Sequence, residues 1–119
     1  MNRQNPEYIN LNYLNEISEG DNQLISEMID IFISEVPSYL KMMHKYQEDK
    51  DWDALGKLAH KAKASSSIMG MGQLTNELKD LELLAKENRE PGLYLALVKR
   101  IENQFNSAIK ELKLISKTL

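Results

Sequence analysis

Apolar residues recur every three or four positions along most of the chain, with polar residues between them. This spacing matches the turn of an α-helix, whereas a half-buried β-strand would alternate apolar and polar residues strictly. No stretch shows that alternation together with the turn residues that bound a β-hairpin. The pattern therefore predicts an all-α protein.

Turn residues and capping residues divide the pattern into five helices. Gly20 ends a short first helix, and Asp21 or Asn22 can cap the second. Asp51 is the expected N-cap of the third helix, and Pro91 suits the first turn of the last. The expected helices run from Leu11 to Ser18, from Asn22 to about Glu48, from Asp51 to about Gly70, from about Gln73 to Glu87, and from Pro91 through Ile115.

The first two helices carry specific expectations. In the first, Leu11, Leu14 and Ile17 lie on one face, which is the face expected to pack on the rest of the molecule. In the second, Pro37 lies inside the helix, where a proline removes a backbone hydrogen bond and clashes with the preceding turn. We therefore expect a kink or a break at Pro37.

The last helix has a long apolar seam whose members alternate steps of four and three, which is typical of a helix packed lengthwise in a bundle. The seam consists of Tyr94, Val98, Ile101, Phe105, Ala108, Leu112 and Ile115. Four long helices and one short one, joined by short loops, predict an antiparallel up-down four-helix bundle with an additional short N-terminal helix. A chain of 119 residues is expected to form it as a single domain, residues 1–119.

Composition and charge exclude several classes of function. The net charge of -3 argues against a general nucleic-acid binder, which would need a basic surface. The absence of cysteine excludes disulfides and thiolate sites and fits a reducing compartment. No apolar run approaches the roughly 18 residues of a membrane span, and the N-terminus lacks the apolar segment of a signal peptide. We expect a cytoplasmic monomer with no nucleic-acid or membrane partner, and the initiator methionine favours a free-standing protein.

His60, one of only two histidines, lies in the stretch LAHKAKASSSIMG. At about 100° per residue, the apolar stripe of this helix lies about 160° to 220° away from His60, so the imidazole is expected on the exposed face. The stripe consists of Leu55, Leu58, Ala62 and Met69. His44 has no comparable surroundings, and we interpret it as a surface residue without a role.

The residues beside His60 on the helix are small or basic, and none is acidic. Lys63 is expected to point outward with His60. The face consists of Gly56, Lys63, Ala64 and Ser67, with Lys57 at its edge and Lys61 somewhat further round. No orienting carboxylate or second nucleophile is visible for acid–base or hydrolytic catalysis. No second histidine or carboxylate has the spacing of a metal ligand, so no metal site is expected.

The imidazole itself remains as a nucleophile. A neutral ring nitrogen can attack a phosphoryl group, and histidine keeps a neutral fraction near pH 7. Lys63, one turn further on, could pair with the phosphate charge. The small neighbours would let another protein bring its phosphoryl donor close, and the lysines would steer an acidic partner.

The segment AHKAKASSSIMG resembles the signature of the histidine-containing phosphotransfer (HPt) domain, roughly A-H-x-x-K-G-S/A-S-x-x-x-G. His60 matches the phosphoaccepting histidine, Lys63 the lysine one turn on, and Gly70 the closing glycine. Ala64 stands where the family usually has glycine. The first two helices and the segment LTNELKDLELLAKE, with its pair Leu81 and Glu82, are also similar to the family.

The resemblance implies a phosphocarrier that relays a phosphoryl group between receiver-domain aspartates through a phosphohistidine at His60. Its implied partners are response-regulator receiver domains and a hybrid sensor histidine kinase. No cofactor is expected, because the magnesium of such reactions belongs to the receiver. We expect no enzyme, since neither a P-loop nor a glycine-rich ATP lid is found. The glutamine that some members use on the fourth helix is not assigned to Gln73.

Two functions remain open at this stage. The first is phosphotransfer with His60 as acceptor, Lys63 stabilising the phosphate charge, and a receiver docking on the surrounding face. That docking face consists of Gly56, Lys57, Lys61, Ala64 and Ser67. The second is a helical adaptor that binds receiver domains without transferring phosphate.

Overall fold

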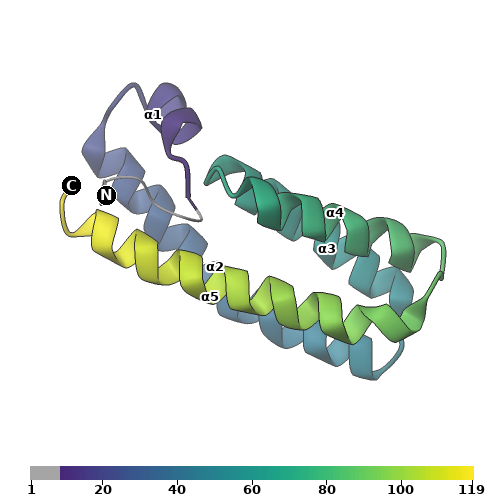
Figure 1. The fold of residues 1–119 in the computed structure, drawn as a ribbon. Coiled ribbons are helices and arrows are strands. Elements are labelled where there is room, and N and C mark those ends of the chain that lie inside the picture. Colours follow the sequence, from purple (N-terminus) through teal and green to yellow (C-terminus); the bar gives the residue numbers. More distant parts are fainter. Residues whose placement is uncertain (1–8) are drawn as a thin grey trace, which may run out of the picture.

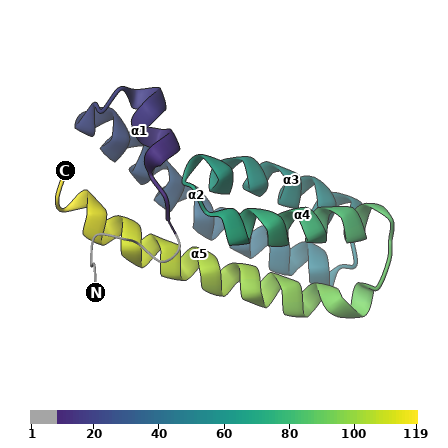
Figure 2. The same ribbon diagram turned by 45° about the horizontal axis from the view of Figure 1, so that its top comes forward.

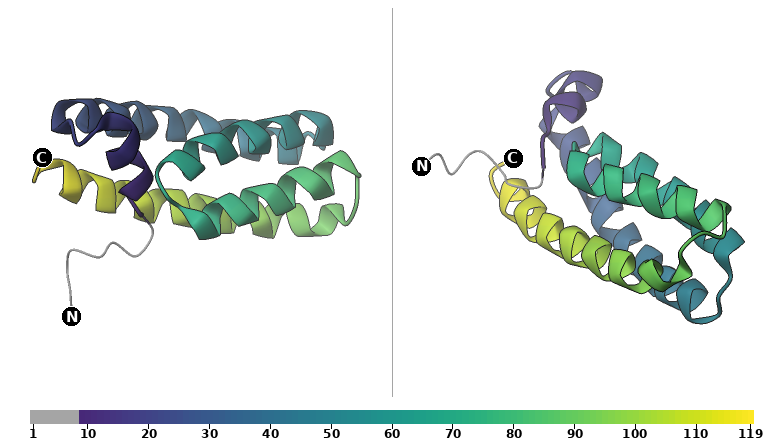
Figure 3. Two further views of the ribbon diagram at one scale, coloured as in Figure 1. Left: turned by 90° about the horizontal axis from the view of Figure 1, so that it is seen from above. Right: turned by 45° about the vertical axis from the view of Figure 1, so that its right-hand side comes forward.

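The computed structural model describes residues 9–119, which form five α-helices and one 3-10 turn and contain no strand. Two long helices, α2 and α5, run lengthwise beside the hairpin of α3 and α4 (Figure 1). The short α1 lies at the end of the bundle where α2 begins and α5 ends (Figure 3). The expected four-helix bundle with an additional N-terminal helix is confirmed. Its elements are α1 (Asn12–Ser18), α2 (Asn22–Glu48), α3 (Trp52–Ile68), α4 (Gly72–Lys86), η1 (Pro91–Leu93) and α5 (Tyr94–Ser116).

The ends of the helices follow the capping residues. The Asp21 carboxylate accepts hydrogen bonds from the backbone N–H groups of Gln23 and Leu24, and Asp51 caps α3 by accepting from Ala54. These bonds satisfy N–H groups that have no partner inside the helix. Pro91 occupies the first position of η1, which leads directly into α5.

Of the two outcomes expected at Pro37, a kink or a break, the break is wrong, because α2 continues through Pro37 from Asn22 to Glu48. The kink stays a prediction. Proline still removes one backbone hydrogen bond. However, Val36 and Leu40, on either side of it, are both buried in the same core. Packing on both sides of the proline therefore holds the helix together, which is how tertiary contacts commonly override a local preference.

The core is built from the stripes that the periodicity defines. The apolar stripe that the periodicity places on α4 is fully buried, and it consists of Leu74, Leu78, Leu81 and Ala85. All members of the α5 seam are buried too except Ile115, which packs against the core at its edge. In α1 the expectation is only partly met. Leu14 is fully buried, whereas Ile17 is 45% exposed. A helix of seven residues at the end of the bundle packs mainly on α2, so it buries a narrower face than its sequence offers.

Helices α3 and α4 lie side by side in the most extensive contact of the bundle (Figure 2). Small residues of α3 make this approach possible. A Cβ atom added to Gly56 would lie 3.5 Å from the Cβ of Ala85 and 3.6 Å from the backbone oxygen of Glu82. Further along, the hydroxyl groups of Ser66 and Thr75 are 2.7 Å apart. The close packing brings the side of α4 that carries Glu82 against α3.

The turn between α3 and α4 is held by the segment that precedes α1. The backbone N–H of Asn10 donates to the carbonyl oxygen of Met69 at 3.3 Å. Gly70 has a φ of +67° at this point, and a Cβ atom there would overlap the backbone of Asn10. Glycine is therefore required both for its backbone conformation and for its lack of a side chain.

No helix within residues 9–119 combines the length and the apolar character that crossing a membrane requires.

We predict that Gly70→Ala destabilises the protein more than Gly20→Ala. Both residues have positive φ, for which a non-glycine residue costs about 1–2 kcal/mol. Only Gly70 also meets another backbone, and overpacking of this kind adds about 1–3 kcal/mol. Urea unfolding of the two variants measures the difference. Gly72→Ala, which has open space and no positive φ, is the neutral control. Equal losses for Gly70→Ala and Gly20→Ala would show that the contact with Asn10 is unimportant.

Candidate functional site

His60 lies at the midpoint of α3 with its side chain 67% exposed. Its Nδ1 atom is 2.7 Å from Oε2 of Glu82, a residue of the neighbouring α4. Within residues 9–119, no hydrogen bond engages the other ring nitrogen, Nε2. The helix wheel was therefore right about exposure. The expectation that His60 has no orienting carboxylate is wrong, because the carboxylate comes from a different helix.

Glu82 is the centre of this site, although its side chain is only 6% exposed. Its Oε1 atom accepts a hydrogen bond from Nζ of Lys63 at 2.9 Å, while its Oε2 atom faces His60. Nζ of Lys86, one turn further along α4, lies 3.8 Å from Oε2. Three basic side chains from two helices thus lie close to one buried carboxylate. They are His60 and Lys63 of α3 and Lys86 of α4.

Glu82 is held in its ionised form. Burial acts to raise the pKa of this carboxyl group, but the hydrogen bonds from Lys63 and His60 outweigh burial and hold the pKa below its ordinary value of 4.5. A carboxyl group whose pKa is lowered by folding stabilises the folded state above pH 4.5 and loses that contribution as the pH falls further. Glu82 is therefore a carboxylate at neutral pH.

The sequence contains a weak signal for Glu82. It follows Leu81 of the buried α4 stripe, so it stands at the edge of that stripe rather than on the outer face. An acidic residue at the edge of a buried face requires a partner. The sequence does not say that the partner comes from α3, because nothing local specifies which side of α4 meets that helix.

Two sequence-based placements need correction. Gly56 was expected on the exposed face but is buried against α4, where its missing side chain allows the helices to approach. Lys63 was expected to point outward, yet its side chain is only 27% exposed and is tied to Glu82. The angular positions of the apolar residues predicted one buried stripe on α3, whereas the contact with α4 also covers the side of α3 next to His60, where Gly56 and Lys63 lie.

The remaining residues of the expected docking face are on the surface. Lys57, Lys61, Ala64 and Ser67 are all exposed, and Lys57 forms an ion pair with Asp53 at 3.1 Å. Two exposed side chains of this kind contribute little stability. The surface around His60 thus carries short side chains at Ala64 and Ser67 and positively charged ones at Lys57 and Lys61.

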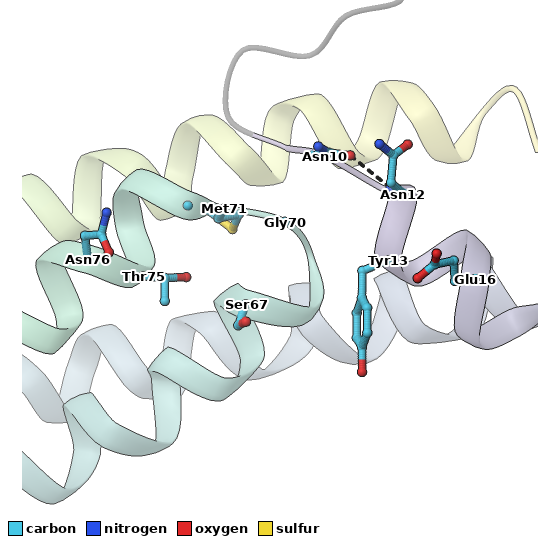
Figure 4. A pocket seen from close by; sticks show the side chains of 10 residues that line it. Asn10, Asn12, Tyr13, Glu16, Ser67, Gly70, Met71, Thr75 and Asn76 are labelled. Carbon is cyan, nitrogen blue, oxygen red and sulfur yellow. Dashed lines mark hydrogen bonds between the residues drawn. The ribbon is translucent and has the colours of Figure 1, made fainter.

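A hollow of about 520 Å³ continues this surface beyond Ser67. It lies between α1 and the turn that joins α3 to α4, and Tyr13 projects along its α1 side (Figure 4). Its lining mixes apolar surface with amide and hydroxyl groups, among them those of Asn10, Asn76 and Thr75. Within residues 9–119, no group of three or more histidine, cysteine, aspartate or glutamate residues is arranged to hold a metal ion.

His44 has a carboxylate partner too, but in a different place. Its Nε2 atom lies 3.1 Å from Oε1 of Glu102, so the pair joins α2 to α5 rather than α3 to α4. The ring is half-buried, and Nε2 is the nitrogen that is occupied. His44 and His60 therefore pair opposite ring nitrogens with a carboxylate, which makes His44 an internal comparison for the site.

Comparisons with known proteins agree with the fold and with the sequence signature. In the solved structures, the chain is similar to histidine-containing phosphotransfer protein B (HptB) from Pseudomonas aeruginosa PAO1, with a TM-score of 0.85 and 23% identity over 97% of this chain and 99% of that one. At this identity, the likeness shows a shared fold. No curated protein sequence matches the chain. The family model of the Hpt domain matches residues 27–113, and because this is well over half of the sequence, the chain belongs to the Hpt domain family.

Proposed function

We propose that this protein relays a phosphoryl group between receiver-domain aspartates through a phosphohistidine at His60. The observation that carries the proposal is the hydrogen bond of 2.7 Å from His60 to the buried Glu82, which leaves Nε2 facing solvent. A histidine that served only to cover the surface would not require a buried carboxylate behind it. Membership of the Hpt family supports phosphotransfer as the chemistry.

Glu82 selects the nucleophilic nitrogen. An ionised carboxylate can only accept hydrogen bonds, so Nδ1 of His60 carries the hydrogen when the ring is neutral. The lone pair then resides on Nε2, the exposed nitrogen. The same carboxylate fixes the plane of the ring, in the way that a buried carboxylate orients the histidine of a catalytic triad.

The transfer proceeds by displacement at phosphorus. Nε2 of His60 attacks the aspartyl phosphate of a receiver, the N–P bond forms, and the bond between phosphorus and the aspartate oxygen breaks. The aspartate leaves as a carboxylate with the electron pair. The imidazole keeps its Nδ1 hydrogen and gains positive charge, which the adjacent Glu82 carboxylate stabilises. Attack by an aspartate of a second receiver reverses these changes and returns the neutral ring.

Docking uses the surface around His60. Ala64 and Ser67 keep it low, so that the recessed aspartate of a receiver can reach the ring, while Lys57 and Lys61 attract an acidic active site. Lys63 stabilises the phosphate charge. Any magnesium ion is expected on the receiver, because a carboxylate-rich pocket is what such a hard cation requires. Ala64, which replaces the usual glycine, adds one methyl group at this surface.

In this role the protein is a phosphocarrier rather than an enzyme, since it ends each cycle unchanged and draws its phosphoryl group from an activated donor. We propose a hybrid sensor histidine kinase as the upstream source and a response regulator as the downstream acceptor. We propose that the protein acts in the cytoplasm together with both partners, and the cysteine-free composition suits that compartment.

We predict that incubation with a radiolabelled phosphorylated receiver transfers an acid-labile, base-stable label to the protein. His60→Gln should abolish the label, because it removes the nucleophile. His44→Gln is the matched control and should be labelled like the parent. Label that survives in His60→Gln would refute the site, and no label from any receiver would favour the adaptor function instead.

We predict opposite tautomers for the neutral rings of the two histidines. His60 should carry its hydrogen on Nδ1 and His44 on Nε2, because each donates to its own carboxylate. Long-range nitrogen–proton NMR spectra distinguish the two forms. Glu82→Ala should change the spectrum of His60 alone, and Glu102→Ala that of His44 alone. A His60 signal that is indifferent to Glu82→Ala would contradict the orienting role.

A further inference from the structure

Lys86 has no part in the transfer described so far, yet it lies at the same carboxylate as His60 and Lys63. Its Nζ atom is 3.8 Å from Oε2 of Glu82, which is an ion-pair distance but too long for a hydrogen bond. Its side chain is 66% exposed. Lys63, by contrast, donates to Glu82 at 2.9 Å from a position that is largely covered. The site therefore contains one lysine already bonded to Glu82 and one held close to it.

A phosphoryl group on Nε2 would disturb this arrangement. It carries close to two negative charges at neutral pH and strong acceptor oxygens. Lys63 is the lysine one turn from His60 on the same helix, so it is placed to respond. If Lys63 turned away, Glu82 would lose its shortest bond to a cation while buried beside a second group of negative charge. Glu82 would then keep only the His60 ring as a close partner, and a buried carboxylate that loses one of its charged partners is destabilised.

We propose that phosphorylation of His60 moves Lys63 from Glu82 to the phosphoryl group, and that Lys86 then closes onto Glu82 in its place. The inference rests on the proposed phosphorylation of His60 and adds a role for Lys86, a positioning residue that acts through Glu82. Lys86 needs to shorten its distance to Oε2 by only about 1 Å to reach hydrogen-bond length. An exposed lysine makes such a change on the picosecond to nanosecond timescale.

The exchange has a chemical consequence for the carrier. In both states Glu82 keeps a lysine partner, so its charge does not repel the phosphoryl group. Glu82 also remains available to the Nδ1 hydrogen of His60, so the ring stays oriented for the second transfer. Without Lys86, Lys63 alone would have to pair with both the phosphoryl group and the Glu82 carboxylate, and the phosphohistidine would be less stable.

The test uses the whole protein phosphorylated on His60 by phosphoramidate, in which Nε2 attacks phosphorus and ammonia leaves. Lysine ammonium groups are observed by nitrogen–proton NMR, where a hydrogen-bonded ammonium gives a signal and a free one is lost to solvent exchange. We expect phosphorylation to shift the Lys63 signal and to make that of Lys86 appear. Lys79, an exposed lysine of the same helix, is the control and should stay invisible in both states.

Two variants separate closure onto Glu82 from a direct contact between Lys86 and the phosphoryl group. In Glu82→Gln, the Lys86 signal of the phosphorylated protein should be lost, because its carboxylate partner is gone. In Lys86→Gln, we expect several-fold faster loss of phosphate from His60 by phosphorus NMR, whereas Lys79→Gln should match the parent. A Lys86 signal that persists in Glu82→Gln, or Lys86→Gln with the parent's phosphohistidine lifetime, overturns the exchange.

The two proposals fail in different ways. Protein that is phosphorylated on His60 but shows no change at Lys63 and Lys86 would refute the exchange and leave the relay intact. Protein that accepts phosphate at His60 neither from phosphoramidate nor from any phosphorylated receiver would refute both.

Discussion

The close contact between α3 and α4 is the constraint on which the rest of the site depends. Gly56 and other small residues of α3 allow the two backbones to approach, and that approach places the carboxylate of Glu82 within hydrogen-bond distance of His60 and Lys63. A Cβ atom at position 56 would reach ordinary van der Waals distance from Ala85, so the contact leaves room for a residue no larger than alanine. The packing and the chemistry therefore rest on the same few contacts.

Burial gives this carboxylate its influence. In a region with little water, a charge acts more strongly on its neighbours than it does at the surface, and it must be paired. Glu82 meets this requirement with groups that the proposed reaction also uses, His60 as its nucleophile and Lys63 to stabilise phosphate charge. The exposed pair of Lys57 and Asp53 shows the contrast, because solvent screens it and it orients nothing.

Most of the fold was predictable from the sequence because helical periodicity and capping are local properties. The stripes of α4 and α5 and the caps Asp21 and Asp51 are where the pattern places them. The break that does not occur at Pro37 and the exposure of Ile17 have one cause. Local rules assign a break to a proline and burial to an apolar residue, whereas the surroundings decide whether packing bridges the first or covers the second.

The sequence by itself determined the helices, the bundle, the exposure of His60 and the spacing between His60 and Lys63. All of these follow from the periodicity and capping residues within single helices. Only the tertiary structure decided that Glu82 orients His60, that Lys63 turns inward to it, and that Gly56 is covered. These contacts join residues about twenty positions apart on different helices. Their distances depend on how closely two helices pack and which faces meet, and periodicity within one helix contains no information about either.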